Sequence, residues 1–318
     1  MTDPQAREHL EWLFAQTGAV PSRETDDAAL TVADRLQALR TNPTWRRLPD
    51  DGNVETADTE VPAGGAGPAL GARLYAARAA PPIGTLVFAH GGGWVAGDLD
   101  ANDALCRALA AATGAQVLSI DYRLAPEHPF PAAVDDLTRA LAFAATGAGG
   151  LVGDTAAVGV AGHSSGGNLA AAVALRARAG EAPTVRCQVL LCPVLDDVDA
   201  SRKSHREYTW GLPLTSQGMQ WYWQQYAPDA GSRRIPDASP LRAPDLTGSA
   251  PAVIVAAEAD PLRDEALEYA TRLIAAGVPT LRVERSGVPH LFLTFPGMTS
   301  RDEVLAEIAP FVRGALGG

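Results

Sequence analysis

The stretch that decides the fold reads Ala157-Val-Gly-Val-Ala-Gly162-His-Ser164-Ser-Gly166-Gly167-Asn168. Its apolar first half favours a β-strand, and the alanine-rich run that follows it favours a helix. Gly-x-Ser-x-Gly between a strand and a helix is the setting of a nucleophile elbow, a sharp turn that exposes a strained serine. Glycines flank the serine because the strand and the helix approach each other closely there. The stretch therefore predicts Ser164 as a nucleophile, with an ordinary Gly/Ser turn as the alternative.

Outward from this stretch, short apolar runs alternate with helix-forming runs. The predicted strands are Thr85–Ala89, Gln116–Ile120, Ala157–Ala161, Arg186–Leu191, Pro251–Ala257 and Thr280–Arg285. The predicted helices are Ala101–Thr113, Ala132–Ala145, Leu169–Ala179, Arg263–Ala276 and Arg301–Leu316. Such alternation predicts an α/β fold with a mostly parallel central sheet flanked by helices on both faces. Two earlier runs, Gly52–Val61 and Ala69–Ala76, predict an antiparallel hairpin at a sheet edge.

Two segments interrupt this alternation. Residues 1–45 carry apolar side chains at helical spacing, on one helix Leu10, Leu13 and Phe14 and on a second Leu30, Val32, Leu36 and Leu39. Residues 196–245 are too long for a plain connection and are rich in aromatic residues: Tyr208, Trp210, Trp221, Tyr222, Trp223 and Tyr226. These rings either only pack a helical insertion or also wall a pocket. We expect one domain over 1–318, with a cap from about 1–45 and 197–245 over the carboxyl edge of the sheet, where open α/β sheets bind ligands.

A nucleophilic serine needs a histidine base and an acid that orients the base. Behind such an elbow, both follow the serine along the chain. Only His205 and His290 do so, and His205 lies in a charged run that is expected to be a solvated face. His290 and Asp260 each follow a predicted strand, so we expect both at the sheet edge that carries Ser164. Rival acids stand close to Asp260 in the sequence: Glu258, Asp264 and Glu265.

A second glycine cluster follows the strand Thr85–Ala89, in the run His90-Gly91-Gly92-Gly93-Trp94. Glycines leave the backbone N–H groups bare, so that a substrate carbonyl can approach them. A His-Gly-Gly-Gly loop supplies one part of an oxyanion hole, and the N–H after the nucleophile, here that of Ser165, supplies the other. Together with the elbow, this loop predicts acyl-transfer chemistry.

These motifs together resemble the hormone-sensitive-lipase-like esterases, a branch of the α/β-hydrolases. The resemblance extends over residues 85–295 and rests on four runs in the family's order: His90–Asp98, Asp121–Pro131, the elbow and Asp260–Asp264. It implies carboxylic-ester hydrolysis with Ser164 as nucleophile, Asp260 as orienting acid and His290 as base. It also implies oxyanion donors at Gly92, with Gly91 or Gly93, and at Ser165, and no metal or organic cofactor.

The sequence departs from the family pattern at three positions. His163 and Ser165 replace the aspartate and alanine of the usual Gly-Asp-Ser-Ala-Gly-Gly, and Leu291 replaces the glycine of the usual His-Gly-Phe. His163 cannot act as the base, because neighbouring side chains diverge at a sharp turn, whereas Leu291 narrows the pocket or moves a loop. We expect the following residues to line the substrate pocket: Trp94, His163, Trp210, Leu212 and Leu291. In the Asp121–Pro131 run we expect Arg123 to pair with Glu127.

Composition excludes several classes of function. The formal net charge is −11 without a basic patch, which argues against a nucleic-acid partner or an anionic membrane surface. The single lysine, Lys203, leaves no phosphate-binding Gly-x-x-x-x-Gly-Lys loop. Three cysteines without metal-site spacing, Cys106, Cys187 and Cys192, are expected to be buried free thiols. With no apolar leader or membrane-length apolar run, we expect a cytoplasmic location and no stable membrane association.

The sequence thus predicts a carboxylesterase for small-molecule esters with short or medium acyl chains. The alternatives are a deacetylase or amidase, a lactone hydrolase with the same triad, or a ligand-binding protein without catalysis, because the same fold hosts all of them. A homo-oligomer that pairs along Thr280–Arg285 is compatible with the sequence.

Overall fold

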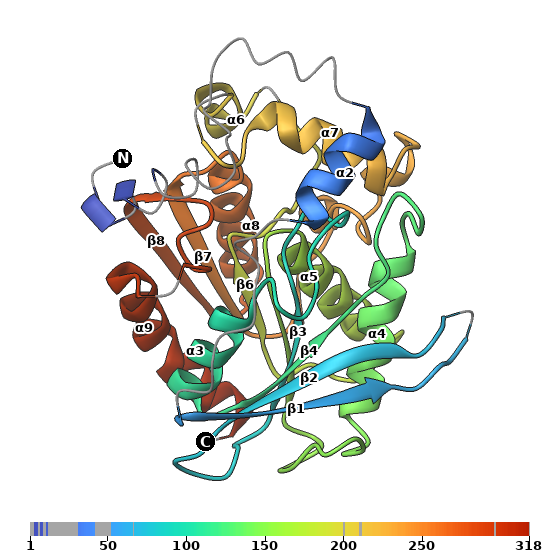
Figure 1. The fold of residues 1–318 in the computed structure, drawn as a ribbon, viewed down its shortest axis with the longest axis vertical. Helices are drawn as coiled ribbons and strands as arrows, with labels where there is room; N and C mark the ends of the chain where they lie inside the picture. The colour runs from blue at the N-terminus through green and yellow to red at the C-terminus, as the bar shows by residue number, and fades with distance from the viewer. Residues whose placement is uncertain are drawn as a thin grey trace.

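A computed structural model describes residues 3–5, 7–8, 11, 31–41, 52–65, 67–199, 201–209, 212–295 and 297–317. An 8-stranded sheet runs through this part of the chain, in the order β1-β2-β4-β3-β5-β6-β7-β8 (Figure 1). Its strands are β1 (Val54–Val61), β2 (Leu70–Ala77), β3 (Thr85–Ala89), β4 (Gln116–Ile120), β5 (Val158–His163), β6 (Gln188–Leu191), β7 (Ala252–Ala259) and β8 (Thr280–Pro289). The strands from β4 to β8 pair in parallel, whereas β1 pairs with β2 and β2 with β4 in antiparallel orientation. The predicted fold class and the edge hairpin are confirmed.

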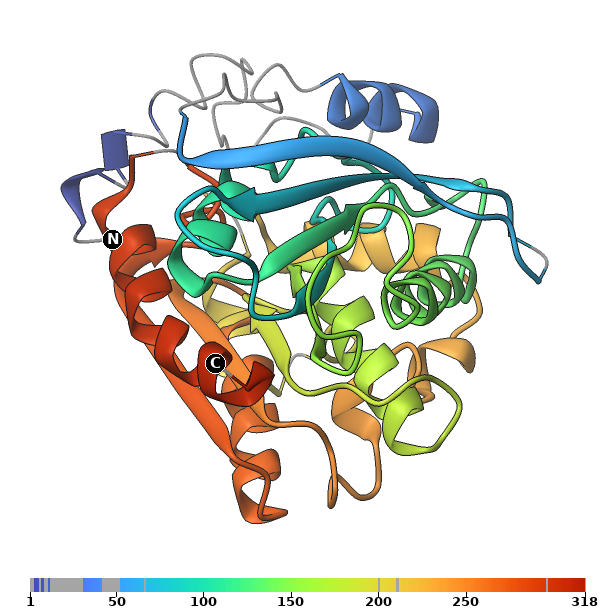
Figure 2. The same ribbon diagram turned by 90° about the horizontal axis from the view of Figure 1, so that it is seen from below.

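Helices cover both faces of the sheet (Figures 1 and 2). One face packs against α3 (Asp103–Thr113) and α9 (Thr299–Leu316), which contribute to one buried apolar cluster. The other packs against α4 (Ala132–Ala144), α5 (Ser165–Arg178) and α8 (Arg263–Ala275), which contribute to a second. Because both faces are covered, central strands such as β3 and β5 are buried along their whole length. This burial explains why they read as continuous apolar runs rather than as alternating ones.

The remaining helices contact the loops that follow parallel strands. They are α2 (Val32–Arg40), α6 (Lys203–Glu207) and α7 (Ser216–Tyr226), with short turns at η2 (Ser232–Arg234) and η3 (Pro240–Arg242). Arg40 of α2 binds a carbonyl in the loop after β3, and Ser204 of α6 binds one in the loop after β7. These helices therefore lie at the carboxyl edge, drawn above the sheet in Figure 1. The apolar residues of the first helix expected in residues 1–45, Leu10, Leu13 and Phe14, lie outside the described residues.

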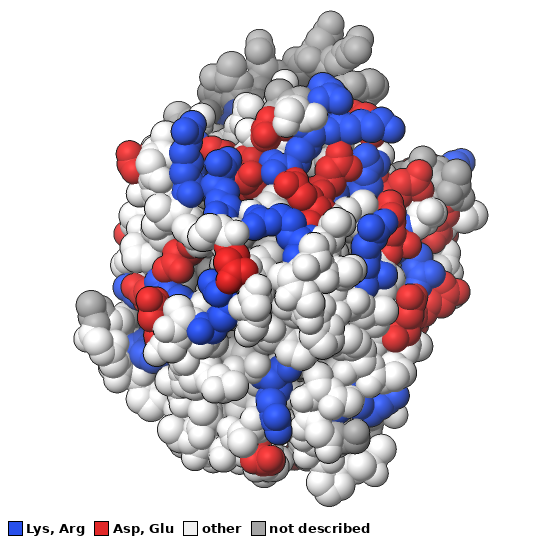
Figure 3. Space-filling view, turned by 180° about the vertical axis from the view of Figure 1, so that it is seen from behind, with Lys and Arg blue, Asp and Glu red and all other residues white. Residues whose placement is uncertain are grey.

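The three cysteines are buried free thiols, as predicted: Cys106 lies on α3, and Cys187 and Cys192 flank β6. On the face shown in Figure 3, acidic and basic side chains lie interspersed over the upper part of the molecule. Ion pairs such as Arg176–Asp135 and Arg263–Glu207 join side chains of opposite charge from different helices. Among the described residues, none of the helices combines the length and the apolar character that crossing a bilayer requires.

Candidate active site

Ser164 lies in the turn between β5 and α5 with φ 58° and ψ −120°, a conformation that side-chain-bearing residues rarely adopt. Its N–H donates to the Leu191 carbonyl at 2.9 Å, and its own carbonyl accepts from Asn168 at 3.1 Å and Val194 at 3.2 Å. Any Cβ at Gly166 would overlap the backbone carbonyl of Ala89 on β3. Glycine is therefore required there, and the surrounding backbone holds the serine in its strained conformation.

Three side chains from separate loops meet at this turn. His290, which follows β8, lies with Nε2 2.9 Å from Ser164 Oγ and Nδ1 2.6 Å from Asp260 Oδ2. Asp260 follows β7, and its other oxygen accepts the N–H of Leu262 at 2.9 Å. A carboxylate at Asp260 accepts from Nδ1–H and thereby leaves Nε2 free to accept the serine proton. The three side chains are nearly buried, with exposed fractions of 7%, 3% and 1% for Ser164, His290 and Asp260.

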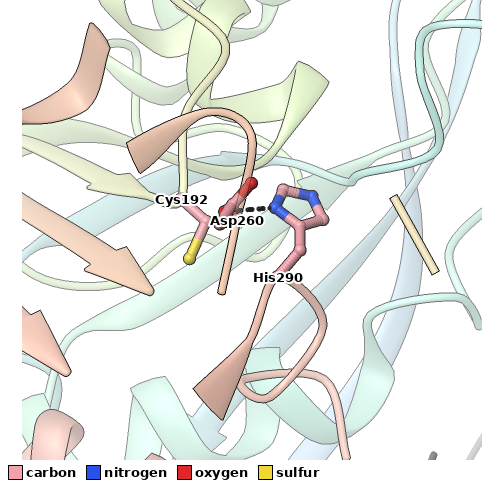
Figure 4. Close-up of side chains that lie close together, drawn as sticks. All are labelled: Cys192, Asp260 and His290. Carbon is pink, nitrogen blue, oxygen red and sulfur yellow. Dashed lines mark hydrogen bonds and ion pairs between the residues drawn. The ribbon is translucent and has the colours of Figure 1, made fainter. Parts of the chain in front are cut away.

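Cys192 lies on the other side of Asp260 from the imidazole (Figure 4). Its sulfur and the facing atoms of Asp260 and His290 all lie within 4.8 Å of one another, a spacing that a metal ion could bridge. Burial, reinforced by the charge of Asp260, raises the pKa of the Cys192 thiol well above its ordinary value. Metal binding requires the thiolate, and the other two groups already bind each other. The hydrogen bond between Asp260 and His290 therefore favours proton transfer through the imidazole, with Cys192 as a buried, protonated neighbour.

The glycine loop after β3 packs against the elbow. A Cβ at Gly91 would lie 3.4 Å from the Cβ of Ser164. The Gly91 N–H, however, donates to Asn102 Oδ1 at 3.0 Å, which engages it within the protein. Gly92 and Gly93, with φ 132° and 62°, have no acceptor for their N–H groups among the described residues. These two N–H groups, rather than that of Gly91, remain available to a ligand.

Ser165 begins α5, and the first N–H groups of a helix have no carbonyl partner within the helix. Its side chain is fully buried, with its hydroxyl near that of Tyr122. The backbone N–H of Ser165 thus points out of the helix end next to Ser164, where the helix dipole favours negative charge.

The residues expected to line the pocket lie in different environments. Trp94 is fully buried and stacks on Tyr226 of α7, with ring centroids 4.3 Å apart and an interplanar angle of 3°. His163 is also buried, and burial together with the neighbouring His290 lowers its pKa to about 3. Leu212 and Leu291 are half-buried. Trp210 lies outside the described residues.

His205 is not on a solvated face, so that expectation is wrong. It is only 4% exposed, and its Nε2 lies 3.4 Å from an oxygen of the fully buried Glu265. The charged run around it is paired by residues far along the chain, which local sequence does not reveal. Each rival acid near Asp260 also has another partner: Glu265 binds the N–H of Leu195, Asp264 that of Ser204 and Glu258 that of Gly287.

The expected pairing of Arg123 with Glu127 is also wrong. Arg123 binds Asp136 on α4, whose carboxylate also accepts the N–H of Arg123. Glu127 instead binds Arg40 on α2 through both carboxylate oxygens, at 2.8 and 2.7 Å. Sequence reasoning had no signal for this partner, which lies 87 residues away.

The sequence of the chain also matches those of known hydrolases. The sequence model of a family described as α/β hydrolase fold matches residues 86–294. The carboxylic ester hydrolase LipN of Mycobacterium tuberculosis is 44% identical over 252 residues, covering 76% of this chain and 65% of LipN, slightly less than two thirds of its length. Ethyl acetate hydrolase of Pseudomonas putida is 38% identical over 231 residues, covering 71% of this chain and 72% of that protein.

Solved structures extend the likeness to the whole chain. A hyperthermophilic esterase of Pyrobaculum calidifontis superposes with a TM-score of 0.83 at 34% identity, covering 99% of both chains. An ester hydrolase from the metagenome of Lake Arreo, solved with a bipyridine phosphonate derivative, superposes with a TM-score of 0.84 at 32% identity, covering 100% of both chains. The chain belongs to the α/β-hydrolase family, in its branch of hormone-sensitive-lipase-like esterases, and is a serine carboxylesterase.

Proposed function

We propose that Ser164 is the nucleophile, His290 the general base and Asp260 the group that orients the base. The observation that carries the proposal is the position of His290, whose two ring nitrogens lie 2.9 Å from Ser164 Oγ and 2.6 Å from Asp260 Oδ2. As the serine oxygen attacks the ester carbonyl, Nε2 takes the hydroxyl proton. Asp260 stabilises the imidazolium that forms, without itself taking the proton.

The attack converts the carbonyl oxygen into an oxyanion. We propose that the N–H groups of Gly92, Gly93 and Ser165 receive it. None of the three has an acceptor among the described residues, Ser165 directly follows the nucleophile, and the glycine loop packs against the elbow at Gly91. Return of the proton from His290 to the alcohol oxygen releases the alcohol and leaves an acyl-serine. Water, activated by the same imidazole, then hydrolyses this acyl-enzyme and regenerates Ser164.

The proposed cap comprises α2, α6 and α7, with the chain around them. α7 lies directly on the oxyanion loop: a Cβ at Gly93 would enter the ring of Tyr222. Trp94 of the same loop packs against both Trp223 and Tyr226 of α7. These bulky rings beside the oxyanion loop support a preference for short or medium acyl chains.

The partner of this site is then a small-molecule ester. The three buried free thiols support the proposed cytoplasmic location, because reducing compartments keep cysteines unpaired. The net charge of −11 speaks against a nucleic-acid partner. β8 is one of the two edge strands of the described sheet, and we propose that two copies pair along it; the mass of the particle in solution tests this pairing.

Hydrolysis of p-nitrophenyl acetate, butyrate, octanoate and palmitate tests the proposal, with Ser164→Ala as the matched inactive variant. We expect turnover that falls beyond the medium-chain esters and a loss of at least about 10⁴-fold in kcat for Ser164→Ala. Activity that rises steadily to palmitate would refute the acyl preference. Rapid labelling by a fluorophosphonate without ester turnover would direct the search to amides, acetyl groups and lactones. Absence of both would refute the assigned nucleophile.

A further inference from the structure

Arg40, at the end of α2, reaches from the proposed cap into the loop that carries the oxyanion glycines. Its Nε donates to the Val95 carbonyl at 2.9 Å, and its Nη2 donates to the Ala125 carbonyl at 3.1 Å. The two loops are joined directly, because the N–H of Ala125 donates to the Trp94 carbonyl at 2.9 Å. One guanidinium therefore holds both the oxyanion loop and the loop beside it.

Glu127 fixes the plane of that guanidinium. Both of its oxygens accept from Arg40, at 2.8 and 2.7 Å, and this bidentate geometry is the most directional that an arginine can form. Hydrogen bonding to Arg40 lowers the pKa of Glu127 to about 2, so the pair stays charged in any physiological buffer. The two side chains are 33% and 53% exposed, and exposed pairs add little to stability. The arrangement orients the guanidinium more than it stabilises the fold.

The hydrogen bond to Val95 extends to the oxyanion site through two peptide units. The Val95 carbonyl shares its planar peptide with the N–H of Ala96, and that N–H donates to the Gly92 carbonyl at 3.1 Å. The Gly92 carbonyl in turn shares its peptide with the N–H of Gly93, which is one of the proposed oxyanion donors. Rotation of either peptide would redirect the Gly93 N–H, and hydrogen bonds in such a chain strengthen one another.

We propose that Arg40 is a positioning residue for ester hydrolysis, which orients the Gly93 N–H through the Val95–Ala96 and Gly92–Gly93 peptide units. The inference rests on the proposed function, since it assigns the Gly93 N–H to the oxyanion. Catalysis then depends on the docking of α2. With α2 in place, Arg40 binds the Val95 carbonyl, and the loop presents the Gly93 N–H to the oxyanion. Without Arg40, the Val95 carbonyl has no partner from α2.

The test compares Arg40→Gln with Arg35→Gln, two variants of the same helix. Arg35 lies over the Trp221 ring of α7, 5.7 Å from its centroid, and so contributes a contact between α2 and α7. On p-nitrophenyl butyrate we expect Arg40→Gln to lower kcat about tenfold with KM within twofold, since the lost interaction acts only on the developing oxyanion. Arg40→Lys keeps the charge but not the forked guanidinium, so we expect its kcat to lie between those of the unaltered enzyme and Arg40→Gln. We expect Arg35→Gln to keep kcat within twofold.

Equal losses in the two glutamine variants, or a rise in KM with unchanged kcat, would show that Arg40 only docks α2 and would overturn the proposal. Glu127→Gln keeps Arg40 but removes the bidentate ion pair that orients its guanidinium, so we expect a two- to threefold loss of kcat. An unchanged kcat in this variant would also overturn the proposal, even if Arg40→Gln does not fold. Failure of the proposed function is distinguishable, because it appears as inactivity of the unaltered enzyme or as full activity of Ser164→Ala.

Discussion

Replacement of His163 by aspartate should move the pH dependence of the enzyme. His163 stands next to the nucleophile, and its ring centroid lies 5.2 Å from that of His290. Its pKa, lowered to about 3 by burial and by His290, keeps it neutral wherever the enzyme is folded and active. An aspartate at this position would place a negative charge beside the base and would stabilise the protonated form of His290.

The size of the effect follows from the distance. A unit charge 5.2 Å from the imidazolium, at an effective dielectric constant of about 20, stabilises it by roughly 3 kcal/mol. A shift of one pKa unit corresponds to about 1.4 kcal/mol. This energy therefore moves the acid limb of the pH–rate profile toward higher pH by about 2 units. Burial of the new carboxylate favours its neutral form and reduces the effect. We therefore expect a shift of about 1 to 2 units toward higher pH.

The assay is kcat/KM for p-nitrophenyl butyrate from pH 4 to 8 in the unaltered enzyme, His163→Asp and His163→Asn. The asparagine variant is the control, since it removes the ring without adding charge, and its acid limb should stay within about 0.3 units of the original. An acid limb that does not move in folded His163→Asp would refute the electrostatic argument. An equal shift in both variants would assign the effect to lost packing instead.

Three further perturbations should give measurable effects. Gly92→Ala places a Cβ on a φ of 132°, where it overlaps a loop carbonyl, so kcat in steady-state assays should fall by about 10²-fold or more; retained kcat would contradict the assigned donors. Glu265→Ala removes the partner of His205 Nε2 and of the buried Leu195 N–H, and urea denaturation should show a loss of about 3 kcal/mol in the free energy of unfolding; a loss under about 1 kcal/mol would contradict the buried pair. Burial lowers the pKa of His90 to about 4 and that of His163 to about 3, from 6.5. Below pH 6.5 the unfolded chain therefore binds more protons than the fold, and the free energy of unfolding should fall by about 2 kcal/mol per histidine at pH 5. His163→Asn should remove its share of this pH dependence; an unchanged pH dependence would contradict the lowered pKa.

Local sequence predicted the parts of the fold that depend on local rules. The elbow around Ser164 and the strand before it follow from glycine spacing and apolar runs, and the same rules place Asp260 and His290 after strands. Because the carboxyl ends of parallel strands meet at one edge, residues far apart in sequence could be expected at one site. Strand ends were less predictable: β8 continues to Pro289, beyond the predicted Arg285.

Long-range pairing of charges could not be predicted in this way. The run around His205 reads as solvated because its partner, Glu265, comes from α8, and no local pattern links the two. Likewise Glu127 binds Arg40 rather than Arg123, because α2 returns over the loop after β4. The Gly91 N–H shows the same limit, since its acceptor Asn102 lies beyond the glycine loop. In each case the partner is set by tertiary packing.

The atoms packed against three glycines near Ser164 show which part of the site substitutions can change and which part they cannot. At Gly162 and Gly166 the space for a Cβ is occupied by backbone carbonyls, which no change of a neighbouring side chain can remove. Beside Gly93 the space is occupied by the ring of Tyr222, a side chain of α7 that a substitution can shorten, whereas Gly93 itself has a φ of 62° that favours glycine. Evolution toward new substrates, in nature or in a directed library, therefore has a fixed centre at the elbow and a variable rim along α7.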